Sequence, residues 1–203
     1  MRDLEQTLIS LRESVGGKLS EKRFQHTVGV EKIAIKLSGY FSDLNLFDLR
    51  AAALLHDIAK ELPIEMCHQK AIKCPISKEF VSLSTPSALH AYAGAALIVE
   101  DYPQFANTQI LSAVAKHTLG APSMNVFDKI IFIADYIEEG RTYPSSIKVR
   151  NYLLGNMTSD IKQNENILNN AIVMAICLTE KFLKQTKSNI DEMSILTKNS
   201  LLS

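Results

Sequence analysis

Apolar residues recur at spacings of three and four in nearly every segment of this chain, and no alternating β-branched run is bounded by turn signals. Such spacing places apolar side chains on one face of an α-helix, whereas a half-buried strand requires alternation. The sequence therefore predicts an all-α protein. The expected helices, by approximate residue range, are 20–39, 46–61, 86–100, 108–118, 125–140, 145–154, 160–184 and 192–202.

Capping residues support several of these boundaries. Ser20, Asn107 and Asn125 each precede a helical segment, and such side chains accept hydrogen bonds from the free N–H groups of the first turn. Asn125 with Asp128 resembles a capping box. Gly140 is placed in the C′ position after helix 125–140.

Composition excludes several classes of protein. Lys plus Arg number 22 and Asp plus Glu number 22, so no overall basic field attracts nucleic acid or anionic lipid. The N-terminus is charged, and the longest uncharged apolar run, 91–99, is too short to span a bilayer. Cys67, Cys74 and Cys177 show no CxxC spacing, which argues against a disulfide framework. We expect a cytoplasmic protein without nucleic-acid or membrane partners.

His56 and Asp57 lie side by side in an apolar, alanine-rich segment. A buried carboxylate without a partner is costly to desolvate, and a metal cation is the obvious partner. On one helix over 46–61, both residues and Lys60 share a face with Ala52 and Ala53. Because alanines let another helix approach closely, we expect the pair to point into a narrow interhelical cleft.

The same chemistry continues on successive predicted helices, with His26 before this pair and His90, His117 and Asp135 after it. Asp135 follows a run that is apolar on all sides, where a carboxylate is costly unless it is paired. A lone histidine on an apolar stripe is more often a core residue, but the regular series argues against that interpretation.

Imidazole nitrogens and carboxylate oxygens suit Fe, Mn, Co, Ni or Zn rather than Mg or Ca. One ion would be held by His26, His56, Asp57 and Asp135. His90 and His117 would hold a second ion, with Asp57 as the bridge. Whether one or two ions bind stays open at this point.

Four segments carry a family resemblance. They are RFQHT at 23–27, ALLHDIAK at 53–60, KHT at 116–118, and IFIADYIE at 131–138 with Gly140-Arg141. With Lys60 completing an HDxxK pattern, the chain resembles the HD superfamily of metal-dependent phosphohydrolases, and most closely its YqeK branch. The similarity covers roughly residues 18–202. It implies a single HD-type domain over 1–203, with a ligand-bearing core at about 18–141 and C-terminal helices at about 145–203.

The resemblance also implies an activity, that of a symmetrical bis(5′-nucleosyl)-tetraphosphatase. Such an enzyme cleaves diadenosine tetraphosphate into two ADP molecules with a metal-activated hydroxide, and the resemblance implies an iron-type metal centre here. Asp57 and Lys60 are the expected catalytic residues. The resemblance leaves open whether two chains form a homodimer. The expected substrate contacts are Arg23, Lys60, Thr118, Gly120, Tyr136 and Arg141.

Three other functions remain alternatives. A different HD phosphohydrolase would act on a nucleoside monophosphate, a cyclic dinucleotide or a guanosine alarmone, and only its products would distinguish it. A diiron HD oxygenase would consume dioxygen, although Lys60 and the arginines favour phosphate chemistry. A non-catalytic regulatory module would use the metal only to hold its helices together.

Overall fold

The computed structural model describes residues 2–76, 81–82 and 84–202, and all regular structure within them is helical. This confirms the all-α prediction. The α-helices are α1 (Arg2–Gly16), α2 (Glu21–Ser38), α3 (Leu46–Leu55), α4 (Ile64–Ala71), α5 (Leu89–Asp101), α6 (Thr108–Lys116), α7 (Val126–Ile137), α8 (Pro144–Asn156), α9 (Ile161–Gln185) and α10 (Glu192–Leu202). Short 3-10 helices cover Pro86–Ala88 and Pro103–Phe105.

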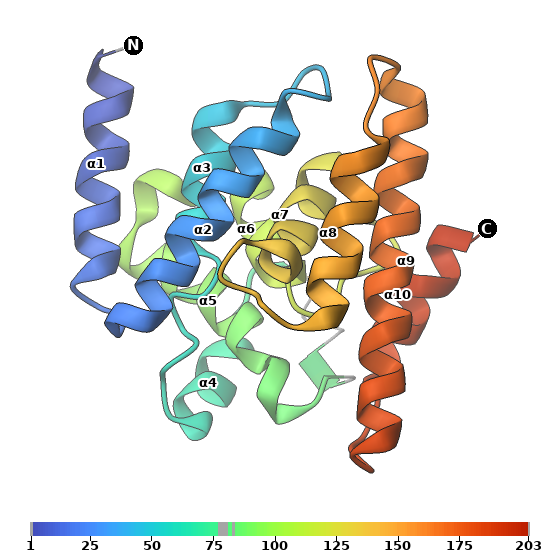
Figure 1. Ribbon diagram of the computed structural model, residues 1–203. Helices are drawn as coiled ribbons and strands as arrows, with labels where there is room; N and C mark the ends of the chain where they lie inside the picture. Colours follow the sequence, from blue (N-terminus) through green and yellow to red (C-terminus); the bar gives the residue numbers. More distant parts are fainter. Residues whose placement is uncertain (1, 77–80, 83, 203) are drawn as a thin grey trace.

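Helix α7 lies at the centre of the bundle. It packs against α2, α3, α6, α8 and α9, and Figure 1 shows it almost end-on between α2 and the α8–α9 pair. Ile130, Ile131 and Ile133 have no exposed surface. Each such side chain contributes about 1.5–3 kcal/mol through burial. A helix that is apolar on every side belongs in the interior, which explains this central position.

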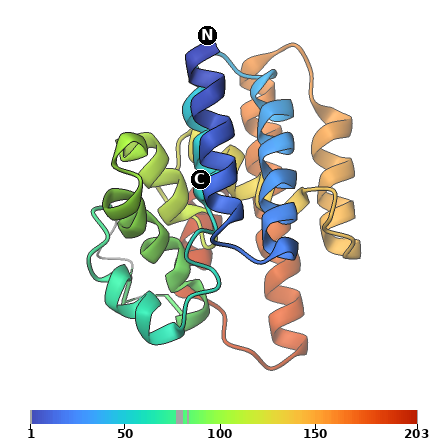
Figure 2. The same cartoon turned by 90° about the vertical axis from the view of Figure 1, so that its left-hand side faces the viewer.

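The remaining helices pack around this central helix. Figure 2 shows α1 and α2 side by side, with α5 and α6 at one flank. Helix α5 packs between α4 and α6, and α10 packs on α9. Among the described residues, no helix is long and apolar enough to cross a membrane.

Three predicted N-caps are confirmed. The side chains of Ser20, Asn107 and Asn125 each accept a hydrogen bond from the backbone N–H three residues later. Asn125 and Asp128 form a reciprocal capping box. These starts were predictable because a cap depends on residues within one turn.

The predicted helix over 46–61 is wrong at its end, because α3 stops at Leu55. Beyond it the N–H of Ile58 donates to the Leu55 carbonyl (3.2 Å) and that of Lys60 donates to the Asp57 carbonyl (2.9 Å). These contacts span three residues and form successive turns rather than an α-helix. His56, Asp57 and Lys60 therefore lie on a turn and not on one helical face, which lets adjacent side chains point to the same site.

The end of helix 125–140 is also wrong, because α7 stops at Ile137. Glu138 is extended (φ −56°, ψ 154°), and Gly140 does not act as the C′ residue of the helix. The carboxylate of Glu138 instead turns inward and accepts a hydrogen bond from the Gly140 N–H (2.6 Å). The other expected helices begin and end within two residues of their predicted ranges, apart from the 3-10 turn at Pro86.

Candidate metal centre

The six predicted metal ligands converge between the helices, from five separate elements. His26 lies in the second turn of α2, His90 in the first turn of α5, and Asp135 near the end of α7. His117 occupies the C-cap of α6, and His56 that of α3, with Asp57 immediately after it. Residues that are distant in the sequence thus meet, because the helices and turns that carry them border the same interhelical space.

Asp57 lies at the centre of this group, and its side chain is only 4% exposed. Its Oδ2 atom lies 3.5 Å from His56 Nε2 and 3.7 Å from His26 Nε2. Its Oδ1 atom lies 3.3 Å from His90 Nε2 and 3.4 Å from His117 Nε2. The two oxygens of one carboxylate therefore face two different sets of nitrogens, which is the arrangement that a bridging ligand needs.

Hydrogen bonds at Nδ1 orient all four histidines. In His56, His90 and His117 this atom faces the backbone carbonyl three residues earlier, and the distances are 2.7, 2.9 and 2.7 Å. In His26 it faces the Glu138 carboxylate (3.1 Å). With the proton held at Nδ1, each ring presents the Nε2 lone pair to the centre, as metal-ligating histidines do.

The donor set fits a divalent transition metal. His56 Nε2 is buried without a hydrogen-bond partner in the described part of the chain, and His26 Nε2 lies 2.9 Å from Asp135 Oδ1. The Nε2 atoms of His90 and His117 lie only 3.2 Å apart, so two lone pairs face each other. Unsatisfied buried nitrogens are costly, and a cation among them removes that cost.

The protonation states agree with this fit. Burial would raise the pKa of Asp57, but the neighbouring histidines hold the pKa of this carboxyl well below its usual range. Burial lowers the pKa of His117 to about 4, so its ring is neutral. Burial would lower the pKa of His26 as well, yet the carboxylates of Asp135 and Glu138 raise it to about 9. A metal ion bound at this position would take the place of that proton.

Three cationic side chains border the ligands. Arg23 Nη1 donates to Asp57 Oδ2 (2.7 Å), and Arg141 Nη2 donates to Asp135 Oδ1 (2.6 Å). Lys60 Nζ lies 3.3 Å from His90 Nε2. All three residues had been predicted as substrate contacts, and the structure places them at the edge of the ligand cluster.

Thr118 and Tyr136 lie on the other side of the cluster. Thr118 Oγ1 is 3.0 Å from His117 Nε2 and 3.1 Å from His90 Nε2. Together with Tyr136 and side chains of α9 and α10, Thr118 lines a small pocket of about 90 Å³. The C-terminal helix therefore closes one flank of the candidate site.

Gly120 is buried beneath α10 instead of lining this small pocket. Its φ is +74°, and a Cβ atom there would lie 2.5 Å from Thr197 Cγ2. Thr197 Oγ1 also donates to the Leu119 carbonyl (3.0 Å). Glycine is thus required for the loop to pass under α10, and direct contact of Gly120 with substrate stays a prediction.

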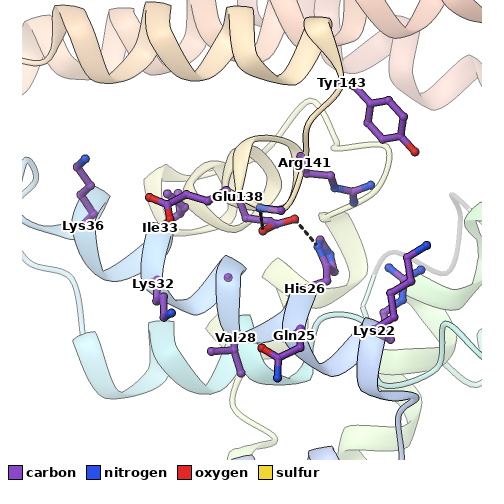
Figure 3. A pocket seen from close by; sticks show the side chains of 14 residues that line it. Lys22, Gln25, His26, Val28, Lys32, Ile33, Lys36, Glu138, Arg141 and Tyr143 are labelled. Atoms are coloured by element: carbon purple, nitrogen blue, oxygen red, sulfur yellow. Dashed lines mark hydrogen bonds and ion pairs between the residues drawn. The ribbon is translucent and has the colours of Figure 1, made fainter.

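Glu138 was not among the predicted site residues, although it is buried and contacts His26 (Figure 3). The space for its carboxylate exists because residue 29 is glycine, since a Cβ atom there would lie 2.5 Å from Glu138 Oε2. An acidic residue three positions after Asp135, at the end of a buried helix, was the available signal. No corresponding signal in the sequence pointed to Gly29, which acts by lacking a side chain.

Comparisons with known proteins agree with this geometry. Residues 23–140 match the HD domain family. The chain is 34% identical to a protein of Halalkalibacterium halodurans named symmetrical bis(5′-nucleosyl)-tetraphosphatase, over 91% of both chains. It is 33% identical to a Bacillus subtilis protein of the same name, over 92% of both chains. A crystal structure from Clostridium acetobutylicum, described as a predicted HD superfamily hydrolase involved in NAD metabolism, has a TM-score of 0.78 at 28% identity, covering 95% of each chain.

Proposed function

This chain belongs to the HD-domain family, and from that premise we propose that it hydrolyses dinucleoside polyphosphates symmetrically, converting diadenosine tetraphosphate into two ADP molecules. One observation carries the proposal. A buried carboxylate, Asp57, lies among four histidines and a second aspartate, with cations suited to phosphate at its edge. The names of the two relatives support this choice among the substrates of HD proteins.

The six ligands would hold one or two divalent transition metal ions, and we propose iron, with manganese, cobalt, nickel or zinc as other candidates. When bound, such an ion supplies Lewis acidity and lowers the pKa of water toward neutrality. The chain contributes the orientation of the ligands, because Nδ1 of every histidine in the cluster is held by a carbonyl or a carboxylate.

Arg23 and Arg141 are proposed to bind the central phosphates. Their side chains are 26% and 32% exposed, so they lie between the buried ligands and solvent. A guanidinium group offers paired donors that match phosphate oxygens. Lys60, beside His90, would add a third positive charge as the negative charge on the phosphate oxygens redistributes.

The reaction is balanced with water alone. The oxygen of water forms a bond to one of the two central phosphorus atoms, and the bond from that atom to the bridging oxygen breaks. The bridging oxygen leaves with the other ADP, and the proton released from water goes to solvent. Thr118 and Tyr136 are proposed to contact the nucleoside at the α10 side of the centre, and Gly120 to shape the loop that carries Thr118.

Product analysis tests this function. The purified protein, loaded with Fe²⁺, Mn²⁺ or Co²⁺, is incubated with diadenosine tetraphosphate, and the nucleotides are separated by ion-exchange chromatography. We expect ADP alone, loss of activity in Asp57→Ala, and an unchanged rate in Asp101→Ala, whose carboxylate is 41% exposed and distant in the fold. In ¹⁸O-labelled water, one of each two ADP molecules would carry the label.

Other outcomes would contradict the proposal. AMP plus ATP would indicate asymmetrical cleavage, and a full rate in Asp57→Ala would remove the centre from the reaction. A nucleoside monophosphate, a cyclic dinucleotide and a guanosine alarmone serve as competing substrates, and faster turnover of any of them would reassign the substrate. Oxygen uptake without phosphate chemistry would favour an oxygenase.

A further inference from the structure

A groove of about 780 Å³ runs along α2, between that helix and the segment 138–143. Its volume falls within the usual range of ligand sites, roughly 300–1,000 Å³. His26, Arg23 and Arg141 line it, so the groove opens directly from the metal centre. This groove was not predictable from the sequence, because its two walls are more than 100 residues apart.

The two ends of the groove differ in charge. Figure 3 shows Lys22, Arg141 and Tyr143 on one side of His26, and Lys32 and Lys36 on the other, beyond Glu138. A phosphate chain running toward Lys36 would pass the Glu138 carboxylate. Of the described residues, no acidic one lines the groove at the Lys22 end, so it is the favourable direction for an anionic ligand.

Tyr143 gives this end a second feature. It directly precedes α8 and is 64% exposed, an unusual position for a large aromatic side chain beside a cationic groove. Although Tyr143 is the N-cap residue of α8, its side chain makes no capping hydrogen bond. An exposed aromatic ring next to phosphate-binding cations is the combination that proteins use to stack a nucleobase.

The ligand cluster itself has two sides. Asp57 Oδ2 faces His26 and Arg23, which line the groove, whereas Asp57 Oδ1 faces His90 and His117, which Thr118 contacts. A substrate cleaved at its midpoint must place one nucleoside diphosphate on each side of the phosphorus–oxygen bond that breaks. The structure offers a tyrosine near each side, Tyr136 toward α10 and Tyr143 in the groove.

We infer that the Lys22–Tyr143 end of the groove binds one nucleoside diphosphate half of the substrate, with Lys22 on its phosphates and the Tyr143 ring stacked on its base. This inference rests on the proposed function for the identity of the substrate. Each half of the substrate then has a separate subsite. Tyr143 would favour nucleotides that carry a nucleoside at both ends of the phosphate chain over nucleotides that carry one at a single end.

The test compares Tyr143→Ala and Tyr143→Phe with Phe182→Ala, a matched control whose aromatic ring on α9 is 61% exposed and lies outside the groove. Binding of a non-hydrolysable diadenosine tetraphosphate with a methylene group at the central bridge is measured by calorimetry on the metal-loaded protein. We expect Tyr143→Ala to weaken binding about 5- to 150-fold, the range for loss of one base–aromatic stack. Tyr143→Phe and Phe182→Ala should bind normally.

Hydrolysis of adenosine 5′-tetraphosphate, which has only one nucleoside, provides the second readout. Its single base can use the Tyr136 side, so we expect Tyr143→Ala to change its KM by no more than about twofold. Equal binding of the two-ended analogue by Tyr143→Ala and Phe182→Ala would overturn the inference, as would an equal loss on both substrates. The proposed function fails separately, through the products of the wild-type protein.

Discussion

Gly29→Ala should damage the metal centre without touching a ligand. The added Cβ atom would lie 2.5 Å from Glu138 Oε2, whereas real Cβ atoms essentially never approach within 3.0 Å. The carboxylate must therefore move away from α2 by about 0.5 Å or more. Because α2 also carries His26, the same movement lengthens the 3.1 Å contact between His26 Nδ1 and Glu138 Oε1, which is already near the limit of a hydrogen bond.

The size of the effect follows from the role of that contact. Loss of a partner that orients a metal-ligating histidine typically weakens metal affinity about 10- to 100-fold, which corresponds to about 1.4–2.7 kcal/mol. Alanine in a helix interior would by itself be favourable by roughly 1 kcal/mol over glycine. We therefore expect weaker Co²⁺ or Mn²⁺ binding by calorimetric titration, without a comparable loss of folding stability in the metal-free protein.

Gly155→Ala is the matched control, because a Cβ atom at this position on α8 meets nothing within 4 Å. It should bind metal as the wild type does. Glu138→Ala should weaken binding as Gly29→Ala does, and the double variant should be no worse than Glu138→Ala, since both changes remove one contact. Wild-type metal affinity in Gly29→Ala would contradict this prediction, as would fully additive losses in the double variant.

Further predictions concern stability. Removal of the metal with a chelator should lower the melting temperature in scanning fluorimetry, because metal at about 100 times its Kd contributes about 2.7 kcal/mol, and an unchanged temperature would argue against a bound ion. Lys116→Met leaves the Asp128 carboxylate buried without its 2.9 Å partner, so the free energy of unfolding in urea should fall by about 3–5 kcal/mol. A loss below about 1 kcal/mol would show that the hydrogen bond from Ser112 is enough to stabilise the buried carboxylate. Thr197→Val removes the hydrogen bond to the Leu119 carbonyl and should cost about 1 kcal/mol, measured in the same way.

Helix starts were predictable where the controlling contact is local. Asn125 and Asp128 are three residues apart and cap α7 as expected. Helix ends were less predictable, because tertiary contacts override the apolar pattern there. The apolar spacing continues past Leu55, yet the chain turns so that His56 and Asp57 both reach the centre, and α7 ends early because Glu138 turns toward His26.

The sequence by itself determined the helical fold and the set of residues that meet at the centre. Helical periodicity is a local property, and histidines and aspartates within apolar runs are visible because burying them without partners is costly. Tertiary structure alone decided which oxygen of Asp57 faces which histidine, how Glu138 fits against Gly29, and that Tyr143 and Lys22 share a groove. Those relations join segments more than 30, and in two cases more than 100, residues apart. Gly29 also contributes by lacking a side chain, which leaves room for the Glu138 carboxylate. Neither periodicity nor residue type could reveal these relations.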